Sequence, residues 1–187
     1  TQFGMSEVEV LGHLVTTEGR KAAIGKVNLI NDWKTPTNAQ ELKSFVCLVT
    51  YLRDYVWKFS EKTLPLRVYL KGKNPKPFSE FAGDELAQRA MKILKESLLR
   101  GATITHFDYE AAKDYRASGP PVQIYMDASQ YGESFAIAQA PAAGKPPKIC
   151  IYKARSYNTT EQGWSTLERE LSAFKYFIEE GSRYIED

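Results

Sequence analysis

Three short apolar runs follow one another closely in the C-terminal third of the chain, at 122–127, 134–139 and 148–153. Turn-forming residues separate them, first "ASQYG" and then "PAAGKPP". Parallel strands need a crossover of about a dozen residues or more, and neither connection is long enough to supply one. The spacing therefore predicts an antiparallel three-stranded meander.

A helix is predicted over about 161–179, directly after the third strand. Thr159 with Gln162 three residues later has the pattern of a capping box. At about 100° per residue, the apolar side chains of this segment occupy one arc of roughly 140°. They are Trp164, Leu167, Leu171, Phe174, Phe177 and Ile178. We expect this helix to cross the face of the sheet toward another strand.

Two carboxylates stand out in these elements. Asp127 ends the first strand on the same face as Gln123 and Tyr125, where α/β architectures commonly gather ligands. Glu170 projects inside the apolar arc, and a carboxylate directed at a core is costly unless it is paired or bound to a cation. The two acids could converge on Mg²⁺, which prefers carboxylate and water oxygens. Two alternatives stay open: Asp127 belongs to an Asx turn, and Glu170 lies at the rim of the helix.

The N-terminal part has a helical pattern after a short β segment. "EVEVLGHLVTTEG" alternates apolar and polar residues, which predicts a strand or hairpin over 7–19, and a short helix follows at 25–33. Two overlapping capping boxes are possible next, Thr37 with Gln40 or Asn38 with Glu41. They open a helix with apolar residues at helical spacing. These are Leu42, Phe45, Val46, Val49, Leu52, Val56 and Phe59.

A further helix is predicted over 84–99, after the Pro- and Lys-rich segment "KGKNPKPF". Its expected inner face consists of Leu86, Ala90, Ile93, Leu94 and Leu98, and its expected solvated side of Arg89, Lys92 and Lys95. The stretch 102–121 has turn chemistry and little periodicity. We therefore expect a junction between two units there.

Charge is distributed unevenly along the chain. Residues 1–75 contain 11 Lys and Arg against 7 Asp and Glu, a net +4, whereas residues 76–187 contain 14 against 16, a net −2. The first part suits a phosphate partner better. No apolar run approaches the roughly 18 residues of a membrane span. Cys47 and Cys150 lie in apolar surroundings without metal-ligand spacing, so both are predicted to be buried free thiols.

Two long segments resemble a known family. "VQIYMDASQYGESFAIAQ" and "ICIYKARSYNTTEQGWSTLERELSAF" resemble the ribonuclease H domain of long-terminal-repeat retrotransposon pol polyproteins of the gypsy/Ty3 group. That family has an apolar strand ending in D-A-S, an "aYxSR" strand, and then "E-x-x-Y-x-x-x-E-x-E-L-x-A". Upstream, the run from "VEVLGHLV" to "PLRVYLKGK" resembles the reverse transcriptase (RT) that precedes it. The resemblance covers nearly the whole chain in one unbroken order.

The resemblance implies an α+β architecture, with a β-hairpin and helical RT thumb followed by a partial RNase H-like fold of a three-stranded meander and a crossover helix. The expected domains are the end of the RT palm with a primer-grip-like hairpin at 1–20, the thumb at 21–75, a connecting helix and linker at 76–121, and an RNase H-like domain, incomplete at its C-terminus, at 122–187. A first residue other than Met suggests that the polypeptide continues beyond Thr1.

The resemblance also implies a function. Asp127 and Glu170 match the first and second metal-binding acids of an RNase H, which hydrolyses the RNA strand of an RNA–DNA hybrid with Mg²⁺ or Mn²⁺ in a two-metal reaction. The family needs further acids later in the chain, and the polymerase aspartates do not occur in these residues. The implied nucleic-acid contacts, by backbone charge and helix shape, are His13, Lys43, Arg53, Lys58 and Lys62. Each of them could instead be an ordinary surface residue.

Several departures from the family support a rival interpretation. Gly132-Glu133-Ser134 replaces "G-x-G", Cys47 replaces a Gly, and Gly163-Trp164 replaces "Asn-Tyr". The chain could be a domesticated, inactive binding or structural subunit, or the product of a truncated pseudogene held in an assembly. We expect an intracellular location, cytoplasmic or nuclear, or a virus-like particle for an active element. Expected partners are a hybrid or template-primer and the rest of the polyprotein or a covering protein.

Overall fold

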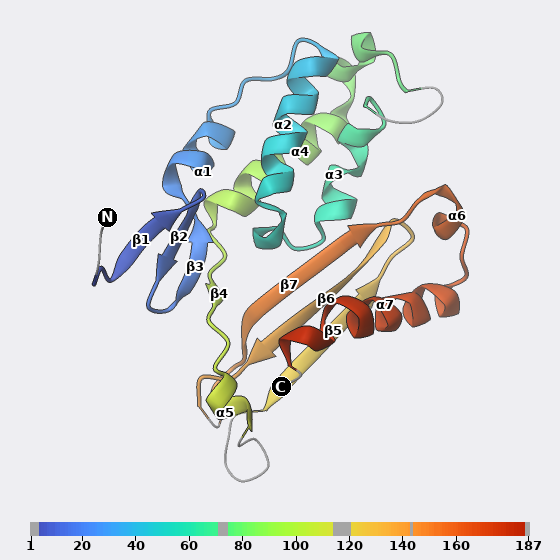
Figure 1. Cartoon of the computed structure of the whole chain (residues 1–187). Helices are drawn as coiled ribbons and strands as arrows, with labels where there is room; N and C mark the ends of the chain where they lie inside the picture. Colours follow the sequence, from blue (N-terminus) through green and yellow to red (C-terminus); the bar gives the residue numbers. More distant parts are fainter. Residues whose placement is uncertain (1–3, 71–74, 114–120, 143, 186–187) are drawn as a thin grey trace. The chain divides into compact units, whose positions relative to one another are not determined.

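The computed structural model describes residues 4–70, 75–113, 121–142 and 144–185. The chain contains two compact units (Figure 1). The first comprises 1–17 with 21–102, and the second comprises 18–20 with 103–187. Helices and antiparallel strands occur together, so the predicted α+β class is confirmed.

The first unit begins with a hairpin. Strand β1 (Glu7–Val10) pairs antiparallel with β2 (His13–Thr16) through a two-residue turn. Leu11 and Gly12 both have positive φ, 49° and 73°, as the tight primed turns of hairpins require. Strand β3 (Gly19–Ala22) and helix α1 (Ile24–Asn31) follow. The predicted hairpin and short helix are therefore confirmed.

Helix α2 (Ala39–Tyr51) begins after Asn38, whose side chain accepts a hydrogen bond from the backbone N–H of Glu41. Of the two predicted caps, the Asn38 one is correct. The prediction of one helix as far as Phe59 is wrong, because the chain passes through a 3-10 turn, η1 (Arg53–Tyr55), and Lys58 has a left-handed φ of 53°. Helix α3 (Phe59–Arg67) starts after that kink. The apolar spacing continued across the break because residues on both sides are buried.

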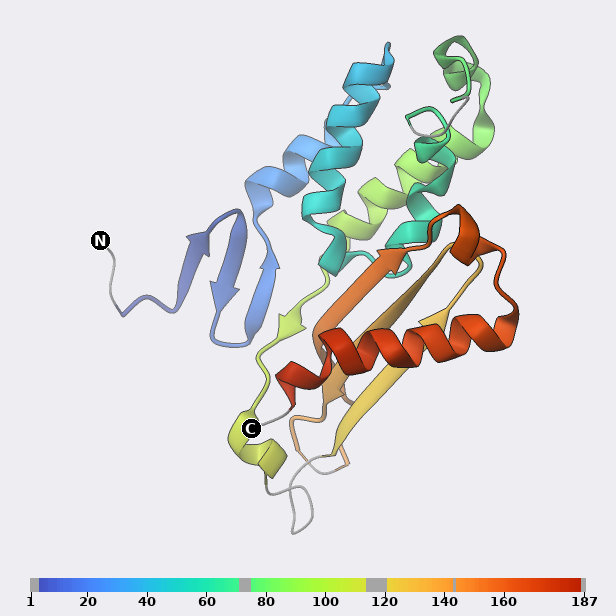
Figure 2. The same ribbon diagram turned by 45° about the vertical axis from the view of Figure 1, so that its right-hand side comes forward.

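Helix α4 (Glu85–Leu99) follows the 3-10 helix η2 (Phe78–Gly83) and packs against α1 and α3 (Figure 2). Its buried face consists of Ala87, Ala90, Met91, Leu94 and Leu98. Leu86 is 69% exposed, so its predicted inner position is wrong. Lys95 is not simply solvated, because its Nζ donates to the carbonyls of Asn31 and Trp33 at the end of α1, 3.0 and 2.5 Å away.

The second unit contains the predicted meander. Strands β5 (Val122–Ala128), β6 (Gly132–Gln139) and β7 (Lys148–Ser156) form an antiparallel sheet in the order β5-β6-β7. The junction before it contains β4 (Ile104–Thr105) and a short helix, α5 (Tyr109–Lys113). Strand β4 pairs with Gly19 and Arg20 of β3. A Cβ atom on Gly19 would lie 2.2 Å from the carbonyl oxygen of Ile104, so this pairing requires glycine.

The predicted helix after the meander is divided into two. Helix α6 (Thr159–Gln162) is capped by Asn158 with Glu161, and α7 (Thr166–Glu180) is capped by Ser165 with Glu168. Both are complete capping boxes, so the predicted box of Thr159 with Gln162 is wrong. A 3-10 turn, η3 (Ser182–Tyr184), follows α7. Helix α7 packs on β5 and β6, where Phe177 joins Phe135 and Ile137 in the core (Figures 1 and 2).

Cys150 is buried as predicted, whereas Cys47 is exposed on α2, so the prediction for Cys47 is wrong. Its apolar sequence neighbours belong to the buried side of the helix, and Cys47 does not. Among the described residues, no helix is long and apolar enough to cross a membrane. Residues 71–74 of the Pro- and Lys-rich segment and residues 114–120 of the predicted junction lie outside the described residues.

Candidate functional site

Asp127 lies one residue before the end of β5, an edge strand of the three-stranded sheet. It pairs with Ser134 of β6 and is half-buried. Strand alternation places it on the face of Gln123 and Tyr125, as predicted. The adjacent residue Ala128 pairs with Glu133 and belongs to the face that meets α7. Asp127 therefore lies at the carboxyl end of the strand, on the face of the sheet opposite to the one that meets α7.

Glu170 is the fifth residue of α7 and is exposed. The prediction that the whole apolar arc of this helix faces the core is wrong. Helix α7 buries Ala173 and Phe177, whereas four members of the predicted arc are about half exposed or more. They are Leu167 at 70%, Leu171 at 59%, Phe174 at 53% and Ile178 at 50%. By helical spacing, Glu170 lies between the sheet-facing side and this exposed apolar side, as the rim alternative predicted.

A buried acid, Glu133, connects the end of β5 with the first half of α7. Its side chain is 0% exposed. Arg155 of β7 donates from Nε to Oε1 at 2.5 Å, and the Tyr157 hydroxyl donates to Oε2 at 2.7 Å. The same hydroxyl lies 3.3 Å from the backbone carbonyl of Arg169 on α7. Because Glu133 pairs with the neighbour of Asp127 and Arg169 is the neighbour of Glu170, the two candidate acids lie at the same end of this unit.

The groups around Glu133 stabilise the charged form of Arg155 and the protonated form of Tyr157. Arg155 also donates from Nη1 to Glu161 at 2.8 Å and from Nη2 to Ser172 at 3.4 Å. Burial alone would lower the pKa of Arg155, but the hydrogen bonds to Glu161 and Glu133 raise it above its usual value. Burial and the Glu133 carboxylate both raise the pKa of Tyr157, so its hydroxyl stays protonated and can donate.

The candidate acids do not line the hollow beside α7. A pocket of about 670 Å³ runs along α7 and includes Glu133, Arg155 and Trp164, but neither Asp127 nor Glu170. In the described part of the chain, no group of three or more His, Cys, Asp or Glu residues could hold a metal ion. A site built on Asp127 and Glu170 would therefore have two protein carboxylates from these residues, with its other oxygens from water or substrate.

Sequence reasoning missed the roles of Arg155 and Tyr157, and it treated Glu133 only as a departure in a turn. One sequence feature could have indicated this pair. Glu133 occupies a core-facing position of its strand, and it lies directly across the sheet from Arg155. Register across strands is needed to recognise such a pair, and local periodicity does not supply it.

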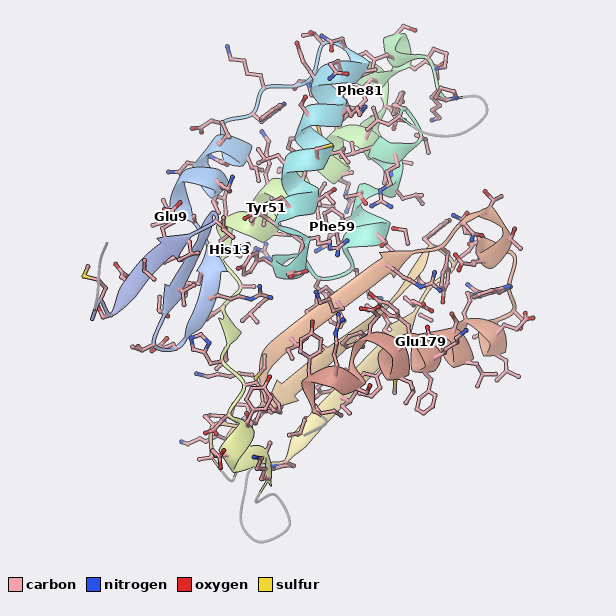
Figure 3. The ribbon with its side chains drawn as sticks, in the orientation of Figure 1. Glu9, His13, Tyr51, Phe59, Phe81 and Glu179 are labelled. Atoms are coloured by element: carbon pink, nitrogen blue, oxygen red, sulfur yellow. The ribbon has the colours of Figure 1, made fainter. Side chains whose placement is uncertain are left out.

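The predicted nucleic-acid contacts of the first unit differ in their surroundings. His13 is half-buried, accepts or donates a hydrogen bond at 2.9 Å between Nδ1 and the Tyr55 hydroxyl, and stacks on Tyr51, with ring centroids 5.2 Å apart (Figure 3). The Tyr51 hydroxyl donates to the carbonyl of Leu11 in the hairpin turn, and Lys26 lies over the Tyr51 ring. His13 thus joins the hairpin to α2.

The predicted basic contacts share no single environment. Lys43 and Lys58 are exposed, and Arg53 is exposed and pairs with Asp54 at 3.9 Å. Lys62 is half-buried, and its Nζ donates to Ser97 of α4 at 3.2 Å. Burial, together with Arg100, lowers the pKa of Lys62. Lys62 therefore connects α3 to α4, whereas the other three project from the surface.

The family described as "RNase H-like domain found in reverse transcriptase" matches residues 84–187, more than half of the chain. The chain belongs to this family. Both candidate acids and the whole network around Glu133 lie within the RNase H-like match. The match also contains the meander and α7, which are the elements that carry these residues.

Two relatives extend the similarity over nearly the whole chain. The retrovirus-related Pol polyprotein from transposon opus of Drosophila melanogaster is 27% identical over 191 residues, which cover 99% of this chain and 18% of that protein. The transposon Tf2-3 polyprotein of Schizosaccharomyces pombe is 23% identical, covering 99% of this chain and 13% of that protein. The resemblance to retrotransposon pol polyproteins is confirmed, and this RNase H-like chain spans less than a fifth of either relative.

Solved structures show the same fold. A foamy viral protease-reverse transcriptase in complex with an RNA/DNA hybrid is 23% identical, with a TM-score of 0.68 over 97% of this chain and 23% of that one. The foamy viral enzyme in complex with dsDNA is 22% identical, with a TM-score of 0.69 over 98% of this chain and 35% of that one. At this identity the likeness establishes the fold.

Proposed function

We propose that this chain binds an RNA–DNA hybrid and supplies two metal-binding acids of an RNase H site that cuts the RNA strand. The observation that supports the proposal is the packing of the strand that carries Asp127 against the helix that carries Glu170. The two acids belong to β5 and α7 of the RNase H-like unit, and one network of contacts joins the residues next to them.

The donor chemistry of the two residues fits a hard divalent cation. Carboxylate oxygens are the protein ligands that Mg²⁺ prefers, and it commonly completes its shell with water and substrate phosphate oxygens. Asp127 and Glu170 would hold Mg²⁺ or Mn²⁺. The bound ions would stabilise the attacking water and the leaving 3′ oxygen of the RNA strand. In this proposal the chain would supply the two carboxylates from the carboxyl end of β5 and from the first half of α7.

The first unit supports hybrid binding by its exposed cations. Lys43, Arg53 and Lys58 are exposed and can neutralise backbone phosphates without reading sequence. Lys62 contributes less because it is half-buried against Ser97. A similar fold binds an RNA/DNA hybrid in the foamy viral structure, which makes a hybrid a reasonable first ligand to test.

Cleavage of a labelled RNA–DNA hybrid in Mg²⁺ tests the nuclease proposal, for the chain and for a polyprotein that carries it. Asp127→Asn and Glu170→Gln should each abolish cleavage by removing a metal-binding charge. Glu179→Gln is the matched control, because Glu179 lies on the same helix and its exposed side chain pairs with Lys175 (Figure 3). Cleavage that survives Asp127→Asn contradicts the proposal. Hybrid binding without any cleavage would favour a domesticated binding role.

The salt dependence of hybrid binding tests the phosphate contacts. Each of Lys43→Gln, Arg53→Gln and Lys58→Gln should reduce the slope of log K against log salt by about 1. Lys92→Gln removes an exposed lysine of α4 that is not among the predicted contacts and should leave the slope unchanged. A slope that no variant changes would exclude these three side chains as phosphate contacts.

A further inference from the structure

The burial of Glu133 is not explained by packing alone. A carboxylate removed from water is costly unless both of its oxygens are paired or hydrogen-bonded. Glu133 meets this condition, since Arg155 occupies Oε1 and Tyr157 occupies Oε2. Breaking a buried pair of this kind is strongly unfavourable because it leaves an uncompensated charge. Glu133 therefore fixes the positions of Arg155 and Tyr157 closely.

Both partners of Glu133 reach into the first half of α7. The Tyr157 hydroxyl lies 3.3 Å from the carbonyl of Arg169, and Nη2 of Arg155 lies 3.4 Å from Oγ of Ser172. These two α7 residues flank Glu170 in sequence. Arg155 in addition contacts Glu161 of α6, which holds the short helix immediately before α7.

The second half of α7 is held mainly by apolar packing, and Arg155 also lies over the ring of Tyr176, 5.7 Å from its centroid. Phe177 packs on Phe135 and Ile137, with the Phe135 and Phe177 ring centroids 5.4 Å apart. Apolar packing of this kind has little directional preference, whereas hydrogen bonds to a backbone carbonyl and a hydroxyl fix position. The two halves of one helix are thus attached to the sheet by different physical means.

We propose that Glu133, acting through Arg155 and Tyr157, is a positioning residue that holds the first half of α7 and so sets the place of Glu170 relative to Asp127. Its consequence for metal binding rests on the proposed function. The network lies one residue away from each candidate acid. Glu133 pairs with Ala128, the neighbour of Asp127, and Tyr157 contacts Arg169, the neighbour of Glu170.

Hydrogen exchange of the full chain tests the attachment itself. Tyr157→Phe removes the hydroxyl and keeps the ring, which packs edge-on against Trp164. Amide exchange in 168–173 should accelerate about tenfold, the loss expected for a hydrogen bond to a charged group, while exchange in 174–180 stays unchanged. Arg155→Lys removes the forked contacts and also the stacking on Tyr176, so it should accelerate exchange in both halves of α7.

Ile137→Val is the matched control. It removes one buried methylene from the core of the same sheet without touching the network. It should accelerate exchange in 174–180, where Phe177 packs on Ile137, and leave 168–173 unchanged. If Tyr157→Phe leaves 168–173 unchanged, or accelerates both halves equally, the inference is overturned.

Titration with Mn²⁺ alone, followed by electron paramagnetic resonance, connects the attachment to the acids. Tyr157→Phe should weaken Mn²⁺ binding about 10- to 100-fold, the range for groups that orient metal ligands, and Ile137→Val should not. If Tyr157→Phe accelerates exchange only in 168–173 and does not weaken Mn²⁺ binding, the inference that Glu133 positions Glu170 is overturned. Wild-type Mn²⁺ affinity in Asp127→Asn would instead contradict the proposed function, and the exchange result would still decide whether Glu133 holds α7.

Discussion

Helices α4 and α7 are equally long, 15 residues each, but they bury very different shares of their apolar side chains. Helix α4 buries five residues along one face, whereas α7 buries Ala173 and Phe177 and leaves a row of larger side chains exposed. Both sequences have helical periodicity. The comparison shows that periodicity identifies an amphipathic helix without telling which part of its apolar arc will be covered.

The partners of the two helices explain the difference. Helix α4 packs against two helices, α1 and α3, which together cover a wide arc. Helix α7 packs on one face of a sheet, at β5 and β6, and a flat surface covers a narrower arc of a helix. The contacts of α7 are consequently divided between a small apolar core and the polar network of Glu133.

The largest effect is expected from a truncation in α4. Leu94 is 0% exposed, so Leu94→Ala should lower the free energy of unfolding by about 2–5 kcal/mol through lost transfer energy and a residual cavity. Urea unfolding followed by circular dichroism measures this change. A loss below about 1 kcal/mol would mean that the core around α4 collapses easily, and the contrast with α7 would weaken.

An intermediate and pH-dependent effect is expected at the start of α4. Asp84 accepts hydrogen bonds from the Tyr69 hydroxyl at 2.7 Å and from the N–H of Ala87 at 3.1 Å, and these lower its pKa from 3.8 to about 2. Because the folded pKa is depressed, this stabilisation is present above about pH 4 and is lost as the pH falls toward 2.

Asp84→Asn should therefore destabilise the chain by about 1–2 kcal/mol at pH 7 and by much less at pH 2, as measured by unfolding at several pH values. The cap of α7 differs in its N-cap group, because the Ser165 hydroxyl that accepts from Glu168 N–H does not titrate in this range, whereas the Glu168 carboxylate of the same capping box does. An equal cost of Asp84→Asn at both pH values would show that its charge is not what stabilises α4.

The smallest effect is expected on the exposed side of α7. Leu167 is 70% exposed, and Leu167→Ala should change the free energy of unfolding by no more than about 0.5 kcal/mol. The same denaturation experiment compares it directly with Leu94→Ala, an identical change of side chain. A cost near that of Leu94→Ala would reveal that the apolar side of α7 is covered in solution.

Much of the fold could be predicted from local patterns. The hairpin over 7–19, the meander after 121 and the helix that starts near Asp84 were all predicted, because turn residues, strand alternation and caps are encoded by neighbouring residues. Errors arose where local patterns were ambiguous. The apolar spacing continued through the left-handed Lys58, and a second capping box at Ser165 competed with the first.

The candidate acids were identified by a different kind of information. Asp127 was predicted from its place at a strand end and from family resemblance, and its strand face is as expected. Glu170 was inferred from an arc assumed to face the core, and that assumption is wrong although Glu170 does lie near the same end of the unit as Asp127. Family resemblance also pointed to Glu170 without that assumption, and its role as a metal-binding acid stays a prediction.

The sequence by itself determined the class of fold, the order of its elements and the family, because these depend on local periodicity and on motifs in linear order. Only the tertiary structure decided that Glu133 is buried against Arg155 and Tyr157, that Lys95 holds the end of α1, and which side of α7 meets the sheet. Each of these depends on strand register or helix packing between residues far apart in sequence, and the free energy of burial is fixed only when those partners meet.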